Sequence, residues 1–269
     1  MAQRIASADN RIGRQILRLH HKKERDETGR YLIEGPNLIQ EAVTMGIPLE
    51  ALLVSDGFPR SSLLIQGRVA DFHAWDKILY EVSDSLFQKL SDTITPQGIL
   101  AIVAKPVWRE EQVFQPGRNV LVLDRVQDPG NLGTILRTAD AAAYGGILVV
   151  KGSGDLFNPK VVRAAAGSLF RLPVGFADSA AAVAELCQQF GKRLICTAPR
   201  GSREYFAVDM RQDIALVLGN EGNGISQELL ERASEQVRLP MAGNVESLNV
   251  AVAAGILLYE SVRQNHQTK

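Results

Sequence analysis

Short apolar runs alternate with amphipathic segments through the second half of the chain. A continuous apolar run is typical of a strand that helices cover on both faces. The segments between the runs carry apolar residues at helical spacing, and several of them end at a glycine. The predicted strands are VLVLD (120–124), ILVV (147–150), KRLICTA (192–198), IALVLG (214–219) and EQVRLP (235–240). This alternation predicts an α/β fold whose C-terminal part is a mostly parallel sheet with helices on both faces.

The first hundred residues predict a second, smaller α/β unit. YLIEG (31–35) and LEALLVS (49–55) are predicted strands on either side of a helix that begins near Pro36. A serine at the start of SDSLFQKLSD predicts a short capped helix, and an apolar strand follows within 95–106. A strand–helix–strand order of this kind favours a compact α/β module.

A polar segment separates the two parts. Residues 108–118 include Pro116 and Gly117 and lack an apolar pattern. We therefore expect a domain over 1–107, a linker over 108–118 and a second domain over 119–269.

Composition and charge exclude several classes of protein. The chain has 269 residues, of which 45% are hydrophobic and 22% charged, which excludes disordered, collagen-like and coiled-coil proteins. Cys187 and Cys196 are too few for a disulfide framework or a zinc site, and both lie in apolar stretches. No apolar stretch approaches the length of a membrane span. We expect a protein of the reducing cytoplasm with no metal and no membrane partner.

The cations are unevenly placed, although Lys plus Arg and Asp plus Glu each number 30. Arg11, Arg14, Arg18 and Lys22 follow a spacing of three or four and would share one face of a helix. Such a stripe is either an ordinary solvated helix face or a surface that follows a phosphate backbone. A net charge of zero does not decide between the two, because only the distribution of charge matters.

Three loops are dense in Gly, Asn, Pro and Ser, and each leads into a predicted helix. They are DRVQDPGNLGTILR (124–137), GNEGNGIS (219–226) and LPMAGNVESLNVA (239–251). Ligands of open parallel sheets bind beyond the carboxyl ends of the strands, which is where these loops begin. We therefore place the candidate site there.

The loops allow more than one interpretation when each is taken alone. The glycines at 219, 222 and 224 do not have the spacing of a dinucleotide-binding loop, and Glu221 would repel a phosphate. Arg137 suits phosphate through its planar fork of donors, and Ser247 is a plausible helix cap. No histidine lies in these loops, which argues against a Ser-His-Asp hydrolase and against a histidine-ligated metal.

Taken together, the loops resemble the SpoU (TrmH) family of RNA ribose 2′-O-methyltransferases, within the SPOUT class. The matching segments are NLGTILRTADAAAYG, LVLGNEGNGIS and LPMAGNVESLNVAVAAGI, in family order, and the resemblance covers about residues 119–265. More weakly, GRYLIEGPNLIQEA resembles the start of a substrate-binding domain attached to many such enzymes, an α/β module related to ribosomal-protein-type RNA binders.

The resemblance implies a deep trefoil knot in the C-terminal part, S-adenosylmethionine as cofactor, and a homodimer through the catalytic domain with the last helix in the contact. It implies no metal. The positions that it assigns to the cofactor are Thr197, Ala198, Leu218, Gly219, Asn220, Gly222, Leu239, Met241 and Leu248.

The resemblance also implies the catalytic residues. Arg137 matches the family's essential arginine, to which a role as general base has been given. Because the pKa of arginine is about 12.5 or higher, we expect it instead to bind a phosphate and lower the pKa of the ribose hydroxyl electrostatically. Asn131, Glu221, Ser247 and Asn249 would orient Arg137 and the ribose.

The expected partner is RNA, which the N-terminal module would bring to the site. The RNA-contacting residues that we predict are Arg11, Arg14, Arg18, Lys22, Lys23 and Arg30. Large-subunit (23S) rRNA is favoured over tRNA, since a separate N-terminal module of this type resembles rRNA-directed relatives.

Three alternatives remain open at this point. The enzyme could act on tRNA, or the chain could be a non-catalytic RNA-binding factor of ribosome assembly on the same fold. The intact set of Arg137, Glu221, Ser247 and Asn249 argues against the second. A nucleotide-binding oxidoreductase is a third, and the glycine spacing argues against it.

Overall fold

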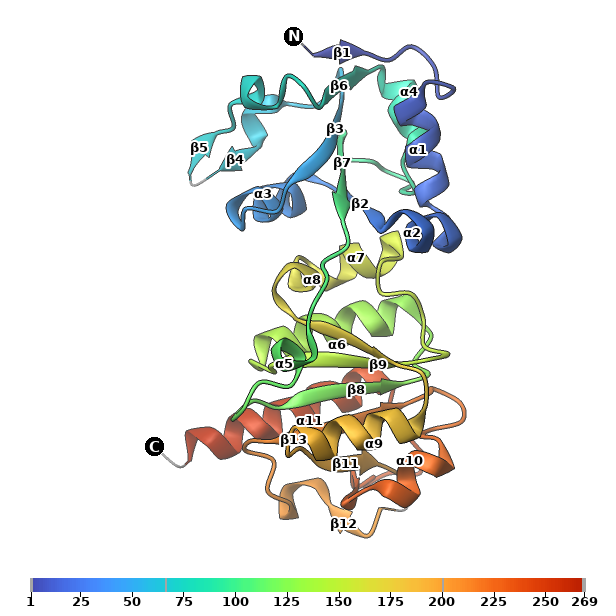
Figure 1. Ribbon diagram of the computed structural model, residues 1–269, viewed down its shortest axis with the longest axis vertical. Helices are drawn as coiled ribbons and strands as arrows, with labels where there is room; N and C mark the ends of the chain where they lie inside the picture. The colour runs from blue at the N-terminus through green and yellow to red at the C-terminus, as the bar shows by residue number, and fades with distance from the viewer. Residues whose placement is uncertain (1, 66, 200, 268–269) are drawn as a thin grey trace. The chain divides into compact units, whose positions relative to one another are not determined.

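The computed structural model describes residues 2–65, 67–199 and 201–267 (Figure 1). The chain divides into two compact units. Unit 1 comprises Met1–Pro106 together with Leu156–Phe170, and unit 2 comprises Val107–Asp155 together with Arg171–Lys269. The chain therefore leaves unit 2 for a short excursion into unit 1, which the pattern of apolar residues did not indicate.

Unit 2 is built on a seven-stranded sheet in the order β10-β9-β8-β13-β11-β14-β12, and every neighbouring pair is parallel. This sheet confirms the predicted fold class. Its strands are β8 (Val120–Asp124), β9 (Gly146–Val150), β10 (Val174–Ala177), β11 (Arg193–Thr197), β12 (Arg203–Glu204), β13 (Ile214–Gly219) and β14 (Glu235–Arg238).

Helices cover both faces of this sheet (Figure 1). On one face, side chains of α5, α9 and α10 share a core with alternate residues of β8, β9, β11 and β13. On the other face, α6 and α11 pack against each other, and α11 contacts β13. The helices are α5 (Glu110–Val113), α6 (Pro129–Ala141), α9 (Ala180–Gln189), α10 (Gln227–Arg232) and α11 (Val250–His266), with a 3-10 turn, η3, at Tyr205–Ala207.

The segment 108–118 differs from the expected linker. It contains α5, and Val113 and Phe114 are buried in the core of unit 2. Phe114 also stacks on Phe190, with 5.0 Å between the ring centroids. Trp108 of the same segment packs against this core as well.

Unit 1 is built on a five-stranded sheet in the order β1-β6-β3-β7-β2. Strand β7 runs antiparallel to both β2 and β3, whereas β6 runs parallel to β1 and β3. The strands are β1 (Gln3–Arg4), β2 (Arg30–Glu34), β3 (Leu49–Ser55), β6 (Leu79–Val82) and β7 (Ile99–Ala104), and a separate hairpin is formed by β4 (Leu64–Ile65) and β5 (Arg68–Val69).

Helices also lie on both faces of the sheet of unit 1 (Figure 1). Helices α1 and α4 share a core with side chains of β2, β3, β6 and β7, while α3 lies on the opposite face. As predicted, the Ser83 hydroxyl caps α4 by accepting a hydrogen bond from the amide of Leu86. The helices are α1 (Arg11–Leu19), α2 (Lys22–Thr28), α3 (Pro36–Thr44), α4 (Asp84–Leu90), α7 (Pro159–Ala165) and α8 (Ser168–Arg171), with 3-10 turns η1 (Arg60–Ser62) and η2 (Phe72–Trp75).

The basic N-terminal segment forms two helices rather than one, which corrects the predicted stripe. Helix α1 ends at Leu19, and Lys22 begins α2 after a break at His20 and His21. Lys22 therefore does not continue the face that Arg18 occupies on α1. The break is held by Arg25, which is buried and whose Nη1 donates to the carbonyl oxygen of Leu19 (2.6 Å).

Within the described residues, none of the helices is both long and apolar enough to cross a membrane.

A buried ammonium group closes one end of unit 2. The side chain of Lys192 is completely shielded from solvent, and its Nζ donates to the carbonyl oxygens of Gln115 (2.7 Å) and Arg118 (2.9 Å) and to Oδ1 of Asp213 (2.6 Å). The amide of Gly117 donates to the same carboxylate oxygen (2.9 Å). This cluster joins the entry to β8 with the entries to β11 and β13.

Replacing Lys192 by methionine is expected to destabilise unit 2 by about 2–4 kcal/mol, because two carbonyls and a carboxylate lose their shared buried donor. The hydrogen bond from Lys192 also holds the pKa of Asp213 below its usual range. The stabilisation is therefore present at neutral pH and is lost as the pH falls through that lowered pKa. Urea unfolding at neutral and acidic pH measures both effects, and Lys192→Met should lose this part of the pH dependence. An unchanged midpoint at neutral pH would contradict the role given to the cluster.

Candidate functional site

The three glycine- and asparagine-rich loops begin at one edge of the parallel sheet of unit 2. Strands β8, β13, β11 and β14 are consecutive neighbours, and all of them run the same way. Gly219 at the end of β13 is paired with Asp124 at the end of β8, and Thr197 at the end of β11 is paired with Val237. The first two loops therefore start side by side, and the third starts at the same edge, after β14.

The loop after β13 is a tight turn built by Asn220. Its backbone pairs with Gly224 in an isolated bridge, and its Oδ1 accepts hydrogen bonds from the amides of Gly222 (3.0 Å) and Asn223 (2.9 Å). A Cβ on Gly219 would lie 2.3 Å from the carbonyl carbon of Gly224, so only glycine fits there. Sequence spacing alone did not distinguish this turn from a ligand loop.

Glu221 connects this turn to the loop after β8. Its carboxylate accepts hydrogen bonds from the amides of Gln127 (3.3 Å) and Asp128 (3.1 Å) and from Nδ2 of Asn131 (3.1 Å). Burial acts to raise the pKa of Glu221, but the hydrogen bonds from Asn131 and from the backbone amides outweigh it, so the pKa lies below its usual value. The predicted carboxylate is therefore a fixed anion that organises polar groups around it.

Asn131 and Asn249 extend the network to the third loop. Nδ2 of Asn249 donates to Oδ1 of Asn131 (3.0 Å), while Oδ1 of Asn249 accepts from the amides of Ala251 and Val252. Asn249 is thus the cap of α11, and the expectation that Ser247 caps this helix is wrong. Ser247 is exposed and precedes the cap by two residues.

Arg137 lies on α6, the helix whose first turn carries Asn131. It is exposed, and its side chain has no hydrogen-bond or ion-pair partner among the residues that the structure describes. An arginine without an internal partner keeps its five donors available for a ligand.

Two residues that the sequence reasoning missed support the same loops. Asp124 is buried, and its Oδ2 accepts from the amide of Ser226 (2.6 Å) at the start of α10. Arg125 follows with a φ of 58°, and its carbonyl oxygen accepts from Nδ2 of Asn220 (2.9 Å). The sequence signal that could have identified Asp124 is a carboxylate directly after the four apolar residues VLVL.

The third loop has the properties of a cradle for a ligand. No hydrogen bond within the described chain involves the backbone of residues 239–248, so its amides and carbonyls stay available. Leu248 is 37% exposed, and Leu239 and Met241 are partly exposed. Free backbone groups beside apolar side chains suit a ligand with a heteroaromatic base and an aliphatic part.

The remaining residues that were predicted to bind the cofactor lie at the edge of the sheet, where burial and hydrogen bonds hold them in place. Leu218 is buried in β13, the Thr197 hydroxyl donates to the carbonyl of Val217 (3.1 Å), and the amide of Ala198 donates to Val237 (2.9 Å). The structure places them at the same edge as Gly219. Their role toward a cofactor stays a prediction.

The predicted RNA-contacting residues of unit 1 fall into two groups. Arg11, Arg14 and Arg18 are exposed on α1, and their side chains have no partner within the described residues. The others are ion-paired: Lys22 with Asp26 (3.3 Å), Lys23 with Glu27 (3.8 Å) and Arg30 with Glu50.

A group of three or more His, Cys, Asp or Glu side chains suited to a metal ion is not found among residues 2–65, 67–199 and 201–267.

Comparison with known proteins gives the same assignment for both parts of the chain. The SpoU rRNA Methylase family matches residues 118–259, and the MRM3-like substrate binding domain matches residues 10–101. The chain is 38% identical over 257 residues to the 23S rRNA (guanosine(2553)-2′-O)-methyltransferase RlmP of Bacillus subtilis, covering 96% of this chain and 98% of that one.

Solved structures resemble the whole chain as well. The AdoMet-bound rRNA methyltransferase of Sinorhizobium meliloti superimposes with a TM-score of 0.86 at 33% identity, covering 98% of each chain. The SpoU methyltransferase AviRb of Streptomyces viridochromogenes in complex with AdoMet has a TM-score of 0.82 at 29% identity, covering 96% of this chain and 98% of that one. The chain belongs to the SpoU rRNA methylase family.

Proposed function

We propose that this protein methylates a ribose 2′-hydroxyl of large-subunit (23S) rRNA, with S-adenosylmethionine as methyl donor. The observation that carries the proposal is the hydrogen-bond network of Glu221, Asn131 and Asn249, which ties three loops together beside Arg137. The 23S substrate is supported by the relative that bears that activity in its name and by the match of the N-terminal part to a substrate-binding domain.

The cofactor site that we propose is the edge formed by Thr197, Ala198, Leu218, Gly219, Asn220 and Gly222 with Leu239, Met241 and Leu248. S-adenosylmethionine supplies an activated methyl group on a sulfonium centre. The free backbone of 239–248 would hold the polar edges of the adenine, and Leu239 and Leu248 would cover its faces.

The proposed role of Arg137 is to bind a phosphate of the substrate and to stabilise the developing negative charge on the ribose oxygen. A guanidinium with a pKa near 12.5 holds its proton too firmly for a general base, whereas its charge lowers the pKa of a neighbouring hydroxyl. Glu221 acts through Asn131 and the backbone of Gln127 and Asp128, and it is a positioning residue. Ser247, exposed beside the α11 cap, would contact the ribose.

The domain roles follow the same proposal. Residues 1–107 would bind RNA, with Arg11, Arg14, Arg18, Lys22, Lys23 and Arg30 as phosphate contacts, residues 108–118 would connect the parts, and residues 119–269 would form the knotted methyltransferase domain. The enzyme would work in the cytoplasm as a homodimer. An apolar row on α11, formed by Val252, Ile256 and Tyr259 at 37–51% exposure, supports a subunit contact through the last helix.

Methyl transfer from labelled S-adenosylmethionine to total RNA of a strain that lacks this protein tests the proposal. After size separation, we expect label in 23S rRNA. Label in the tRNA fraction would keep the enzyme and replace the substrate. No label in any fraction, with cofactor binding measured separately, would favour the non-catalytic RNA-binding alternative.

Arg137→Ala is expected to lower kcat at least about 100-fold, because it removes the charge that stabilises the developing negative charge on the ribose oxygen. Cofactor affinity and Tm should stay unchanged, since Arg137 is exposed and has no partner among the described residues. Single-turnover methyl transfer measures the effect, and Arg137→Lys, which keeps the charge but not the fork, should recover part of it. Full activity in the alanine variant would remove Arg137 from the mechanism.

Glu221→Gln is expected to lower methyl transfer about tenfold, because an amide cannot accept all four donors that converge on this carboxylate. Because its pKa is lowered, Glu221 stays ionised around neutral pH. The wild-type rate of methyl transfer should therefore not change in this pH range through titration of Glu221. The variant should lose rate equally at every neutral pH tested. A defect confined to one side of neutrality would mean that Glu221 exchanges a proton during the reaction.

Replacing both Arg14 and Arg18 with alanine should weaken RNA binding and flatten its salt dependence by about two in the log–log slope, one for each lost phosphate contact. Filter binding of a 23S transcript over a range of salt measures the slope. Lys77→Ala, at an exposed cation of the same unit, serves as the control and should leave it unchanged. A double variant with the wild-type slope would exclude the α1 stripe from the RNA interface.

A further inference from the structure

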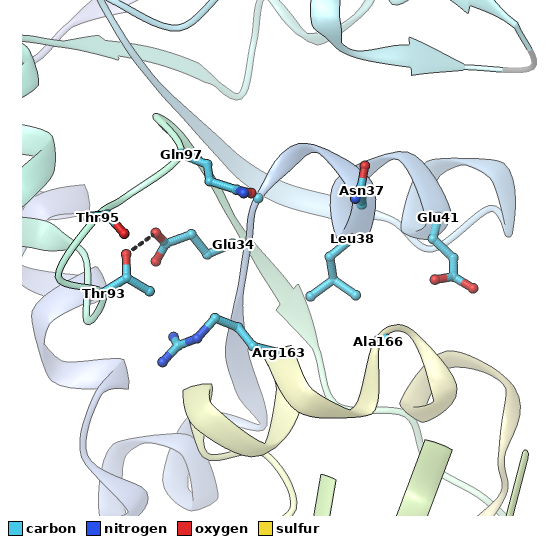
Figure 2. A pocket seen from close by; sticks show the side chains of 10 residues that line it. Glu34, Asn37, Leu38, Glu41, Thr93, Thr95, Gln97, Arg163 and Ala166 are labelled. Carbon is cyan, nitrogen blue, oxygen red and sulfur yellow. Dashed lines mark hydrogen bonds between the residues drawn. The ribbon is translucent and has the colours of Figure 1, made fainter. Parts of the chain in front are cut away.

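Unit 1 contains a cavity that the cofactor and catalytic residues do not use. Its volume is about 370 Å³, within the range of sites for small ligands. It is lined by the turn from β2 into α3, by the loop 91–98 and by α7 (Figure 2). The side chain of Leu38 points from α3 toward the turn that carries Ala166 and gives the cavity an apolar wall.

One wall of the cavity is a loop that a carboxylate holds in place. Glu34 accepts hydrogen bonds from the hydroxyls of Ser91 and Thr93, each at 2.8 Å. Nε2 of Gln88 donates to the carbonyl oxygen of Ile94 (3.2 Å) from the other side. The loop that carries the lining residues Thr93 and Thr95 is thereby fixed.

The polar groups at the cavity are of the kind that pair with neutral ligands. Asn37, Thr95 and Gln97 are exposed, and their side chains make no hydrogen bond to any described residue. A carboxamide both donates and accepts, so it can pair with the edge of any nucleobase.

The charge of the lining disfavours a phosphate. Two carboxylates, Glu34 and Glu41, face the cavity against one guanidinium, that of Arg163, which itself lies 3.6 Å from a carboxylate oxygen of Asp92. Carboxylates accept hydrogen bonds from the amino groups of bases and repel the anionic backbone.

We propose that this cavity binds one unpaired nucleobase of the RNA, with Leu38 packed against the base and the Asn37 and Gln97 carboxamides on its edge. This inference rests on the proposed RNA substrate, and it gives α1 and the cavity different roles in RNA binding. The arginines of α1 follow phosphates, whereas the cavity recognises a base that the RNA fold leaves unstacked, as sequence-specific RNA readers do.

The test compares Asn37→Ala, Gln97→Ala and the double variant Asn37→Ala/Gln97→Ala with the wild type, using a naked 23S rRNA transcript. Gln3→Ala is the matched control, because Gln3 also carries an exposed carboxamide in unit 1 and does not line the cavity. Binding to the cavity variants should be about 5- to 100-fold weaker with an unchanged salt slope, because a base contact releases no counterions. The control should bind as the wild type does.

Chemical probing of the transcript gives a second readout. One unpaired base should lose its reactivity on binding the wild type and regain it with the Asn37→Ala/Gln97→Ala variant. Cofactor binding and Tm should be equal in all variants, since the replaced side chains are exposed and have no partner among the described residues.

Three results would overturn the inference. Wild-type affinity and protection in the cavity variants would do so and would leave the methyltransferase proposal standing, provided that the wild type methylates the same RNA. A flattened salt slope would assign the cavity to phosphate contacts. Normal binding to naked RNA with weakened binding to ribosomal particles would assign it to a protein partner. A wild type that neither binds nor methylates any RNA would refute the proposed function itself.

Discussion

The carboxylate of Glu221 is the acceptor on which the arrangement of the site depends. Parallel strands bring the ends of β8 and β13 to one edge of the sheet. The loops that follow these ends are rich in polar residues and glycine, which have no apolar side chains to pack into a core. Glu221 gives two backbone amides and Asn131 a common partner, and Asn131 in turn fixes Asn249 at the start of α11. A single anion thus sets the positions of three loops.

This arrangement separates the groups that hold the site from the group that would act on the substrate. The asparagines and Glu221 satisfy one another, and Asp124 and Arg125 support the turn from beneath. Arg137 has no partner within the described chain and is exposed, so its charge is neutralised only by what binds. The exposed guanidinium of Arg137, on the same helix as Asn131, supplies the positive charge that electrostatic catalysis on a ribose hydroxyl requires.

Local signals in the sequence predicted most elements but not the contacts between distant ones. Strands β8, β9, β11 and β13 were found because their buried residues form apolar runs, whereas β10 and β12 were not predicted. The cap of α11 was misplaced because Ser247 and Asn249 are both good cap residues and only the backbone selects one.

The break between α1 and α2 carries no glycine or proline, and it depends on Arg25, whose burial no local pattern indicates. The excursion 156–170 and the bond from Ser226 to Asp124 are non-local and have no sequence signature.

The most direct measurement asks which atom of the RNA receives the methyl group. Ribosomal RNA labelled by the enzyme is hydrolysed with alkali, which cleaves every linkage except one next to a 2′-O-methylated ribose. Our account predicts that the label from 23S rRNA appears in alkali-resistant dinucleotides, and that it is absent when Arg137→Ala replaces the wild type. Label in mononucleotides would place the methyl group on a base and would contradict the account.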